Sequence, residues 1–163
     1  MRAVDDPVLG PVRLDRFFWE CEHAVPFLGA TLLFMIDPEE RSGPLTDKQR
    51  QVFLSILELP AAARARMAHP IYANYVKIRG AVEADDMPAI ANVDDVWRYV
   101  EPRHILIPRH RASPYSYFFV ALECAWEPEH GLEVLFRDGR VLHASQQEGL
   151  GTNAAWYASY LNE

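Results

Sequence analysis

Carboxylates and a histidine gather in one short stretch of the chain, and they are the first residues to consider for chemistry. The segment Glu123-Cys124-Ala125-Trp126-Glu127-Pro128-Glu129-His130-Gly131-Leu132 has the pattern of a strand, a short connection and a second strand. Pro128 fixes φ early in the connection, and Gly131 can adopt the left-handed conformation that closes such loops. Glu129 and His130 would then lie at the loop tip, in the combination of residue types that general acid–base catalysis uses.

Three interpretations of this loop are open: a turn alone, a recognition surface, or a catalytic Glu129–His130 pair. Catalysis requires a third orienting group and a pocket, and the sequence shows neither, although Glu123 or His143 would be the nearest candidates. The sequence therefore favours a turn or a recognition surface, and we predict no catalytic residue. The candidate binding residues of this segment are Trp126, Glu127, Glu129 and His130.

The sequence contains none of the common patterns for a metal, a nucleophile or a phosphate. Cys21-Glu22-His23 brings three types of metal ligand together, but neighbouring side chains on a strand point to opposite faces. The metal-binding patterns Cys-x-x-Cys, His-Glu-x-x-His and His-x-His do not occur, nor does a Gly-x-Ser-x-Gly elbow or a Gly-rich loop before a helix. Cys124 falls on the core side of its predicted strand, where a cysteine behaves as a small apolar residue. We therefore expect no metal and no cofactor.

Composition indicates one globular domain over residues 1–163, with 50% hydrophobic residues and a net charge of −7. This negative charge disfavours general binding to nucleic acid and is compatible with a basic protein partner. The longest apolar run, Ala30–Ile36, is too short for a membrane helix. The acidic amino-terminal residues do not resemble a signal peptide, and two cysteines are too few for a disulfide framework, so we expect a cytoplasmic protein with free thiols.

Charge is also segregated along the chain. The stretch from Glu83 to Asp95 contains five acids and no Lys or Arg, whereas the stretch from Arg103 to Arg111 contains three arginines, two histidines and no acid. The acidic stretch could contact a basic partner and the basic stretch could contact phosphate. Solvated loops explain both stretches with fewer assumptions.

The first half of the chain predicts a hairpin followed by helices. Val12–Glu20 and Ala30–Ile36 have strand patterns, with residues 23–29 as the connection. Thr46 with Gln49 three residues later forms a capping box, and the helix that it begins stops before Pro60. A second helix covers Ala61–Val82, either kinked at Pro70 or restarted there. A short helix capped by Asn92 or Asp94 and a brief strand from His104 to Pro108 follow.

The last third predicts a meander of strands, Tyr115–Trp126, Leu132–Arg137 and the segment after Asp138-Gly139. This dipeptide predicts a two-residue type I′ turn that pairs Arg137 with Arg140. Phe136 should then face Val141, and Val134 should face His143. A short helix over Thr152–Leu161 would carry Trp156. Nothing alternates in the βαβ manner, so the predicted fold class is α+β, an antiparallel sheet (opening hairpin plus carboxy-terminal meander) packed against two or three helices.

The two faces of the meander have different predicted roles. Phe118, Val120 and Leu122 belong to the face that packs on the helices. The other face carries Tyr117 and Phe119 and needs a cover, which the opening hairpin or the tail around Trp156 can supply. If neither covers it, this aromatic face is a binding surface for a partner or a second copy, and Tyr117 and Phe119 are therefore binding candidates.

Two segments give the chain a family resemblance. The run Trp126-Glu127-Pro128-Glu129-His130-Gly131-Leu132, followed by Phe136-Arg137-Asp138-Gly139, resembles a segment of an uncharacterised bacterial family. Asp6-Pro7-Val8-Leu9-Gly10 before a hairpin and Thr46-Asp47-Lys48-Gln49 at a helix start are similar as well. The resemblance is to small bacterial proteins with a domain of unknown function, some of them immunity proteins of polymorphic toxin systems. It implies an immunity-like protein and assigns no catalytic residue.

Two functional hypotheses follow from the sequence. The favoured one is a non-catalytic protein-binding module, of the immunity type if the resemblance extends to function, with a basic partner or self-association. The alternative is an uncharacterised enzyme that uses the Glu129/His130 cluster. A role in nucleic-acid binding through residues 103–111 ranks below both.

Overall fold

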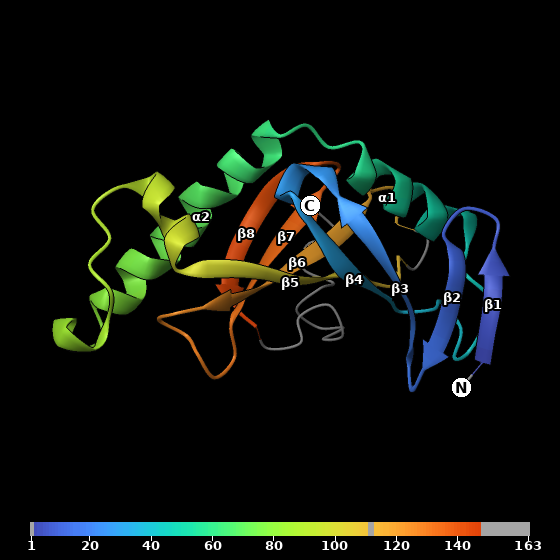
Figure 1. Cartoon of the computed structure of the whole chain (residues 1–163), viewed down its shortest axis with the longest axis horizontal. Coiled ribbons are helices and arrows are strands. Elements are labelled where there is room, and N and C mark those ends of the chain that lie inside the picture. Colours follow the sequence, from blue (N-terminus) through green and yellow to red (C-terminus); the bar gives the residue numbers. More distant parts are fainter. Residues whose placement is uncertain (1, 111–112, 148–163) are drawn as a thin grey trace.

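Eight strands form one sheet in which each strand lies beside its neighbour in the chain (Figure 1). The computed structural model describes residues 2–110 and 113–147, and the predicted α+β class is confirmed. The strands are β1 (Arg2–Asp6), β2 (Gly10–Asp15), β3 (Phe18–Val25), β4 (Ala30–Ile36), β5 (Val100–Ile107), β6 (Tyr117–Cys124), β7 (Leu132–Arg137) and β8 (Arg140–Gln146). The helices are α1 (Asp47–Leu57) and α2 (Ala62–Arg79), with short 3-10 helices η1 (Pro26–Leu28), η2 (Ala84–Asp86) and η3 (Val93–Arg98).

The opening of the chain is a four-stranded meander and not the predicted hairpin. The predicted strand Val12–Glu20 is wrong, because the chain turns at Arg16, whose φ of 53° is left-handed, and continues as a separate strand. The predicted connection over residues 23–29 is also too long. β3 extends to Val25 because it pairs with β4 along its length, and η1 with Gly29 makes the connection.

Helix α1 begins as predicted, with a capping box. The Thr46 hydroxyl accepts a hydrogen bond from the Gln49 backbone N–H, and the Gln49 side chain accepts one from the Thr46 backbone N–H, each at 3.2 Å. Gln49 is fully buried, and its amide also donates to the backbone carbonyl of Asp37 at 2.7 Å. The capping residue therefore fixes the helix start against the end of β4 as well.

Helix α2 runs through Pro70 without ending, and Gly80 follows its last turn as predicted. Its buried residues include Met67, Ile71 and Tyr75 of the predicted apolar stripe. The predicted short helix near Asn92 is the 3-10 helix η3, and the Asn92 side chain does not cap it.

The prediction that no βαβ-like crossover occurs is wrong. β4 and β5 pair in parallel, with Leu33 opposite His104 and Ile36 opposite Ile107, and both α-helices lie in the connection between them. The other strand pairs are antiparallel, so the sheet is mostly antiparallel. β5 is also longer than the predicted strand from His104 to Pro108, because its first residues pair with the end of β6.

The last hairpin has the predicted turn, with Asp138 and Gly139 at φ of 48° and 76°. The predicted pairs of Arg137 with Arg140 and of Phe136 with Val141 are confirmed. The predicted pair of Val134 with His143 is wrong, because a β-bulge makes Leu142 an extra residue. His143 therefore lies opposite Leu135.

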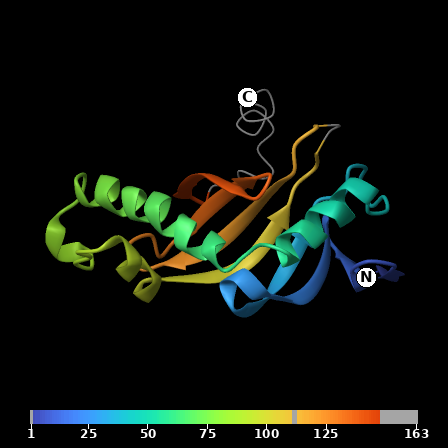
Figure 2. The ribbon, with the colours of Figure 1, turned by 90° about the horizontal axis from the view of Figure 1, so that it is seen from above.

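The helices and the sheet share one core. Six residues that the sequence places together there are each at most 1% exposed: Val52, Phe53, Ile56, Val120, Leu122 and Phe136. Figure 2 shows both helices on the same side of the sheet. Cys21 and Cys124 belong to this core as free cysteines, and burial raises the pKa of each thiol to about 12.

A second, smaller cluster lies on the opposite face of the sheet and contains Leu106, Tyr117, Phe119 and Leu135. Phe18 and Met35 of the opening strands pack against it, so part of its cover comes from the predicted source. The predicted helix over residues 152–161, including Trp156, lies outside the described residues. Within residues 2–110 and 113–147, the helices lack the length and apolar character needed to cross a membrane.

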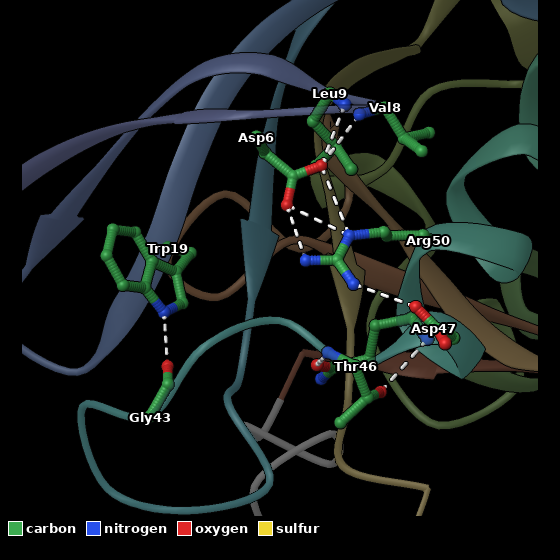
Figure 3. Close-up of polar contacts among 9 residues, drawn as sticks. Asp6, Val8, Leu9, Trp19, Gly43, Thr46, Asp47 and Arg50 are labelled. Atoms are coloured by element: carbon green, nitrogen blue, oxygen red, sulfur yellow. Dashed lines mark hydrogen bonds and ion pairs between the residues drawn. The ribbon is translucent and has the colours of Figure 1, made fainter.

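The segment Asp6-Pro7-Val8-Leu9-Gly10 joins the first hairpin to α1 (Figure 3). The Asp6 carboxylate accepts hydrogen bonds from the backbone N–H groups of Val8 and Leu9, at 2.9 and 3.1 Å. The same carboxylate accepts three further bonds from the Arg50 guanidinium, which also contacts Asp47. This conspicuous sequence motif therefore has a structural role, the closure of the turn and its attachment to the helix.

Candidate functional site

Trp126 anchors the loop between β6 and β7 to helix α2. Its indole is 6% exposed, and its Nε1–H donates to Asn74 Oδ1 at 3.0 Å. Its ring also packs edge-on against Tyr75, with 5.3 Å between ring centroids. A buried indole with its polar atom satisfied cannot take part in an exposed recognition surface, so the predicted binding role of Trp126 is replaced by a structural one.

Gly131 closes this loop in the left-handed conformation that the sequence predicts. Its φ is 70°, and its N–H donates to the Glu127 carbonyl at 2.8 Å. A Cβ at this position would lie 2.3 Å from the Leu122 carbonyl oxygen, so a larger residue does not fit without movement of the backbone. The turn function of the segment therefore rests on a specific steric requirement.

The charged residues at the loop tip pair differently from the catalytic arrangement considered above. His130 Nδ1 lies 3.0 Å from Glu127 Oε1, in a contact within the loop. In the part of the chain that the structure describes, no hydrogen bond or ion pair joins Glu129 to His130. Glu129 and His130 are both exposed, and Glu127 is half-buried.

This loop forms one wall of an open hollow of about 1020 Å³. The other walls come from the end of η3, from β5 and from β6, and the Ala125 N–H donates to the Tyr99 carbonyl at 2.9 Å across this region. Glu129 and His130 therefore line a hollow, together with Glu101 and Glu123.

Cys124 and His104, which also line the hollow, are not activated for nucleophilic chemistry. The Cys124 thiol stays protonated at neutral pH, since burial raises its pKa to about 12. Burial, and secondly the charge of Arg103, lower the pKa of His104, so this half-buried imidazole is neutral at pH 7. Arg103 forms an ion pair with Glu123 from the next strand.

In the described part of the basic stretch, residues 103–110, both arginines are paired with acids. Arg103 pairs with Glu123, and Arg109 Nε lies 3.0 Å from Asp37 Oδ1. His110 is 2% exposed, and burial lowers its pKa to about 4, so it is neutral. These contacts use the charges internally and give no support to nucleic-acid binding through this stretch.

The predicted binding residues Tyr117 and Phe119 are buried, at 0% and 1% exposure. An exposed aromatic patch on this face of the meander is therefore wrong as a prediction, because the face is covered within the chain. The hollow beside the loop, in contrast, brings together Glu129 and His130 with residues that sequence analysis did not select, among them Tyr99 and Glu101. Glu101 lies opposite Glu123 in the pairing of β5 with β6. Knowledge of this strand pairing would therefore have added Glu101 to the candidates.

The acidic residues gather at the same end of the molecule. Figures 1 and 2 both place the segment after α2, η3 and the loop between β6 and β7 at the end opposite β1. Residues 80–101 and 123–131 together hold nine carboxylates and one arginine. Two further arginines contact these residues, Arg64 at Trp97 and Arg103 at Glu123, so that nine carboxylates meet three arginines. We call this region the acidic end. Its carboxylates are Glu83, Asp85, Asp86, Asp94, Asp95, Glu101, Glu123, Glu127 and Glu129.

The acidic residues of this end are not arranged as a cluster of metal ligands among the described residues. In residues 2–110 and 113–147, no three or more His, Cys, Asp or Glu side chains are placed to share an ion. In the Cys21-Glu22-His23 segment, Cys21 is buried in the core, and His23 Nε2 lies 2.9 Å from the Leu9 carbonyl oxygen. The segment lies within β3, so its residues have structural roles in a strand and do not form a turn at a strand end.

Comparison with known proteins identifies a family but no individual relative. A family model described as "Domain of unknown function (DUF6985)" matches residues 8–151. No curated protein and no solved structure matches the chain.

Proposed function

The chain belongs to the DUF6985 family, and from this premise we propose that it is a non-catalytic protein-binding module whose acidic end binds a basic partner protein. The observation that carries the proposal is the concentration of the chain's negative charge at one end, beside an open hollow. Such a field attracts a positively charged surface and increases the rate of association.

The hollow has the side chains that would bind lysine or arginine. Tyr99 is a half-buried aromatic residue at its edge, and Glu101 and Glu129 are exposed carboxylates of the same lining. The neighbouring Trp97 already holds a cation, since the Arg64 guanidinium lies 4.4 Å from its ring centroid. Aromatic faces attract cations, and carboxylates pair with them. A basic segment of a partner would therefore find both kinds of contact in one place.

The contacts of the loop support binding over the enzyme alternative. His130 pairs with Glu127, and Glu129 remains exposed at the rim. In the same hollow, His104 is neutral and half-buried, the Cys124 thiol is protonated, and Glu123 is paired with Arg103. An acid–base mechanism would require a rearrangement of these residues.

We further propose that the partner is a bacterial toxin and that the chain is an immunity-type inhibitor acting in the cytoplasm. The support is the resemblance of the Trp126–Leu132 and Asp6–Gly10 segments to immunity-like proteins. A toxin that acts on nucleic acid needs a positive surface for the phosphates of its substrate. The acidic end is complementary to such a surface and would cover it.

The test is to co-express the chain with the product of the adjacent gene and to measure growth and complex formation. If that product is toxic and the chain neutralises it, the double substitution Glu101→Lys and Glu129→Lys should abolish the rescue and weaken the complex, more strongly at low salt.

The matched control carries Asp5→Lys and Glu58→Lys, two exposed acids outside the acidic end with the same change of charge. This control should rescue growth like the wild type. Equal loss in both variants would mean that total charge matters and that the acidic end is not the binding site. Neutralisation accompanied by turnover of a substrate, lost in Glu129→Gln, would support the enzyme alternative.

A further inference from the structure

The surface between α2 and β8 has the opposite charge to the acidic end. Its basic residues are Arg66 and Lys77 of α2 and Arg140 of β8, and neither α2 nor β8 contains an acid. The neighbouring charge also acts on the histidine of β8, because burial and then the charge of Lys77 lower the pKa of His143. This surface is therefore positive within a chain whose total charge is negative.

Two hollows lie along this surface. One, of about 460 Å³, lies between the second half of α2 and β8, and the other, of about 490 Å³, lies between Arg66 and Arg140. Both are lined by Pro70 and Leu142, so they adjoin at these residues, and we call the two together the groove. Leu142 is the extra residue of the β-bulge, and the groove thus has an apolar point at its middle and basic residues on either side.

β8 is the last strand of the sheet, and its residues form one wall of the groove. It pairs with β7 from Arg140 to Gln146, and no further strand lies beside it among residues 2–110 and 113–147. An edge strand can accept another extended chain through backbone hydrogen bonds. Small residues, Ala73 of α2 and Ala144 and Ser145 of β8, leave room for it.

We propose that this groove binds an extended acidic peptide, which adds a strand beside β8 and places its carboxylates against Arg66, Lys77 and Arg140. The charge of the groove selects an anion, and the adjoining strand edge selects a peptide backbone over a nucleic acid. The chain's net charge of −7 further disfavours a polyanion as long as nucleic acid. This groove is separate from the acidic end, and it binds negatively charged ligands where the acidic end binds positively charged ones.

The experiment measures binding of fluorescein-labelled peptides to the full chain by fluorescence anisotropy. The probes are an eight-residue peptide in which Glu alternates with Thr, the same peptide with Lys in place of Glu, and the Glu peptide N-methylated at alternate residues. We expect binding of the unmodified Glu peptide, which weakens with salt, and little binding of the other two, since the Lys peptide has the wrong charge and the methylated one lacks backbone donors.

The double substitution Arg66→Glu and Arg140→Glu should weaken binding of the Glu peptide about tenfold or more, as expected for the loss of two charge contacts. The control Arg2→Glu with Arg41→Glu makes the same change of charge at exposed residues elsewhere and should bind like the wild type. Unfolding curves of both variants identify any loss of fold, and Lys77→Ala provides a milder second variant at the same groove.

Three results would overturn the proposal. Equal binding of the methylated peptide would mean that charge alone acts and no strand is added. Tighter binding of a twelve-nucleotide thymidine oligomer than of the Glu peptide would assign the groove to nucleic acid. Equal affinity of the groove variant and the control variant would place any peptide binding elsewhere. None of these results depends on the acidic end, so failure here leaves the proposed function untouched.

Discussion

Asp6 and Arg50 form an ion pair between the first turn of the chain and helix α1 (Figure 3). Arg50 Nε donates to Asp6 Oδ1 and Oδ2 at 3.3 and 3.0 Å, and Nη2 donates to Oδ2 at 2.9 Å. The two residues lie 44 positions apart in the sequence, and the Asp6 side chain is 5% exposed. Burial alone would raise the pKa of Asp6, but the hydrogen bonds from Arg50, Val8 and Leu9 outweigh it and lower the pKa.

Asp6→Ala should destabilise the protein by about 3 kcal/mol, because the Arg50 charge and two backbone N–H groups lose their acceptor. Since the folded pKa of Asp6 is lowered, its contribution is present above the unfolded pKa and is lost as the pH falls through the folded value. Urea unfolding at pH 7 and at acidic pH measures both effects. Asp5→Ala, at the exposed neighbouring position, should change stability by less than about 0.5 kcal/mol; equal effects of the two substitutions would contradict the role of the pair.

His110 should make stability depend on pH. Its Nε2 accepts from the Tyr117 N–H at 3.0 Å, and its Nδ1 lies 3.0 Å from the Pro108 carbonyl oxygen, which fixes the neutral form with the proton on Nδ1. Burial lowers its pKa from 6.5 to about 4, so the unfolded chain takes up the proton first as the pH falls. The contribution of His110 is complete above about pH 6.5 and is lost towards pH 4, at a cost of about 3 kcal/mol.

His110→Gln keeps an acceptor for Tyr117 but does not titrate in this range. The free energy of unfolding of this variant should therefore fall less steeply between pH 7 and pH 4 than that of the wild type. Parallel curves for the two proteins would show that His110 is not responsible.

Gly131→Ala should destabilise more than Gly10→Ala, although the two glycines have nearly the same φ, 70° and 75°. The left-handed conformation alone costs an alanine about 1–2 kcal/mol at either position. At Gly131 the added Cβ also meets the Leu122 carbonyl at 2.3 Å, whereas at Gly10 nothing lies within 4 Å. We expect a further cost of about 1–3 kcal/mol for Gly131→Ala, measured by chemical denaturation. A smaller effect than that of Gly10→Ala would disprove the close approach.

Leu122→Ala should cost about 2–5 kcal/mol, because Leu122 is 1% exposed in the core shared by the helices and the sheet. Leu54→Ala on α1, at 44% exposure, is the comparison and should cost less than about 1 kcal/mol. A loss below about 1 kcal/mol for Leu122→Ala would mean that the face of β6 is assigned incorrectly.

Elements with local sequence signals were predictable, and elements defined by distant partners were not. The capping box of Thr46 and Gln49 and the turn at Asp138-Gly139 are encoded within a few residues, and both were found where predicted. The turn at Arg16 has no glycine or asparagine to indicate it, and the bulge at Leu142 depends on the partner strand. The parallel pairing of β4 with β5 joins strands separated by both helices, and no local pattern indicates it.

The candidate site, too, was predictable only where its residues are close in the sequence. The loop with Glu129 and His130 was recognised from its own residues, but the hollow beside it also requires η3 and β5, which only the pairing of β5 with β6 brings there. Tyr117 and Phe119 were placed on the correct face by alternation, yet alternation does not show whether a face is covered.

The parallel pairing of β4 with β5 also has a consequence for how the chain folds. Each of the other strand pairs joins strands that are neighbours in the chain. The longest of these connections, between β5 and β6, has nine residues, so forming these hairpins has a small entropic cost of loop closure. The β4–β5 pairing closes a loop formed by residues 37–99 in one step. It joins two meanders, β1–β4 and β5–β8, into one sheet. We expect this closure to come late and to limit the folding rate, whereas lengthening the loop near η2 should slow it only slightly, since doubling a loop adds only about 0.6 kcal/mol.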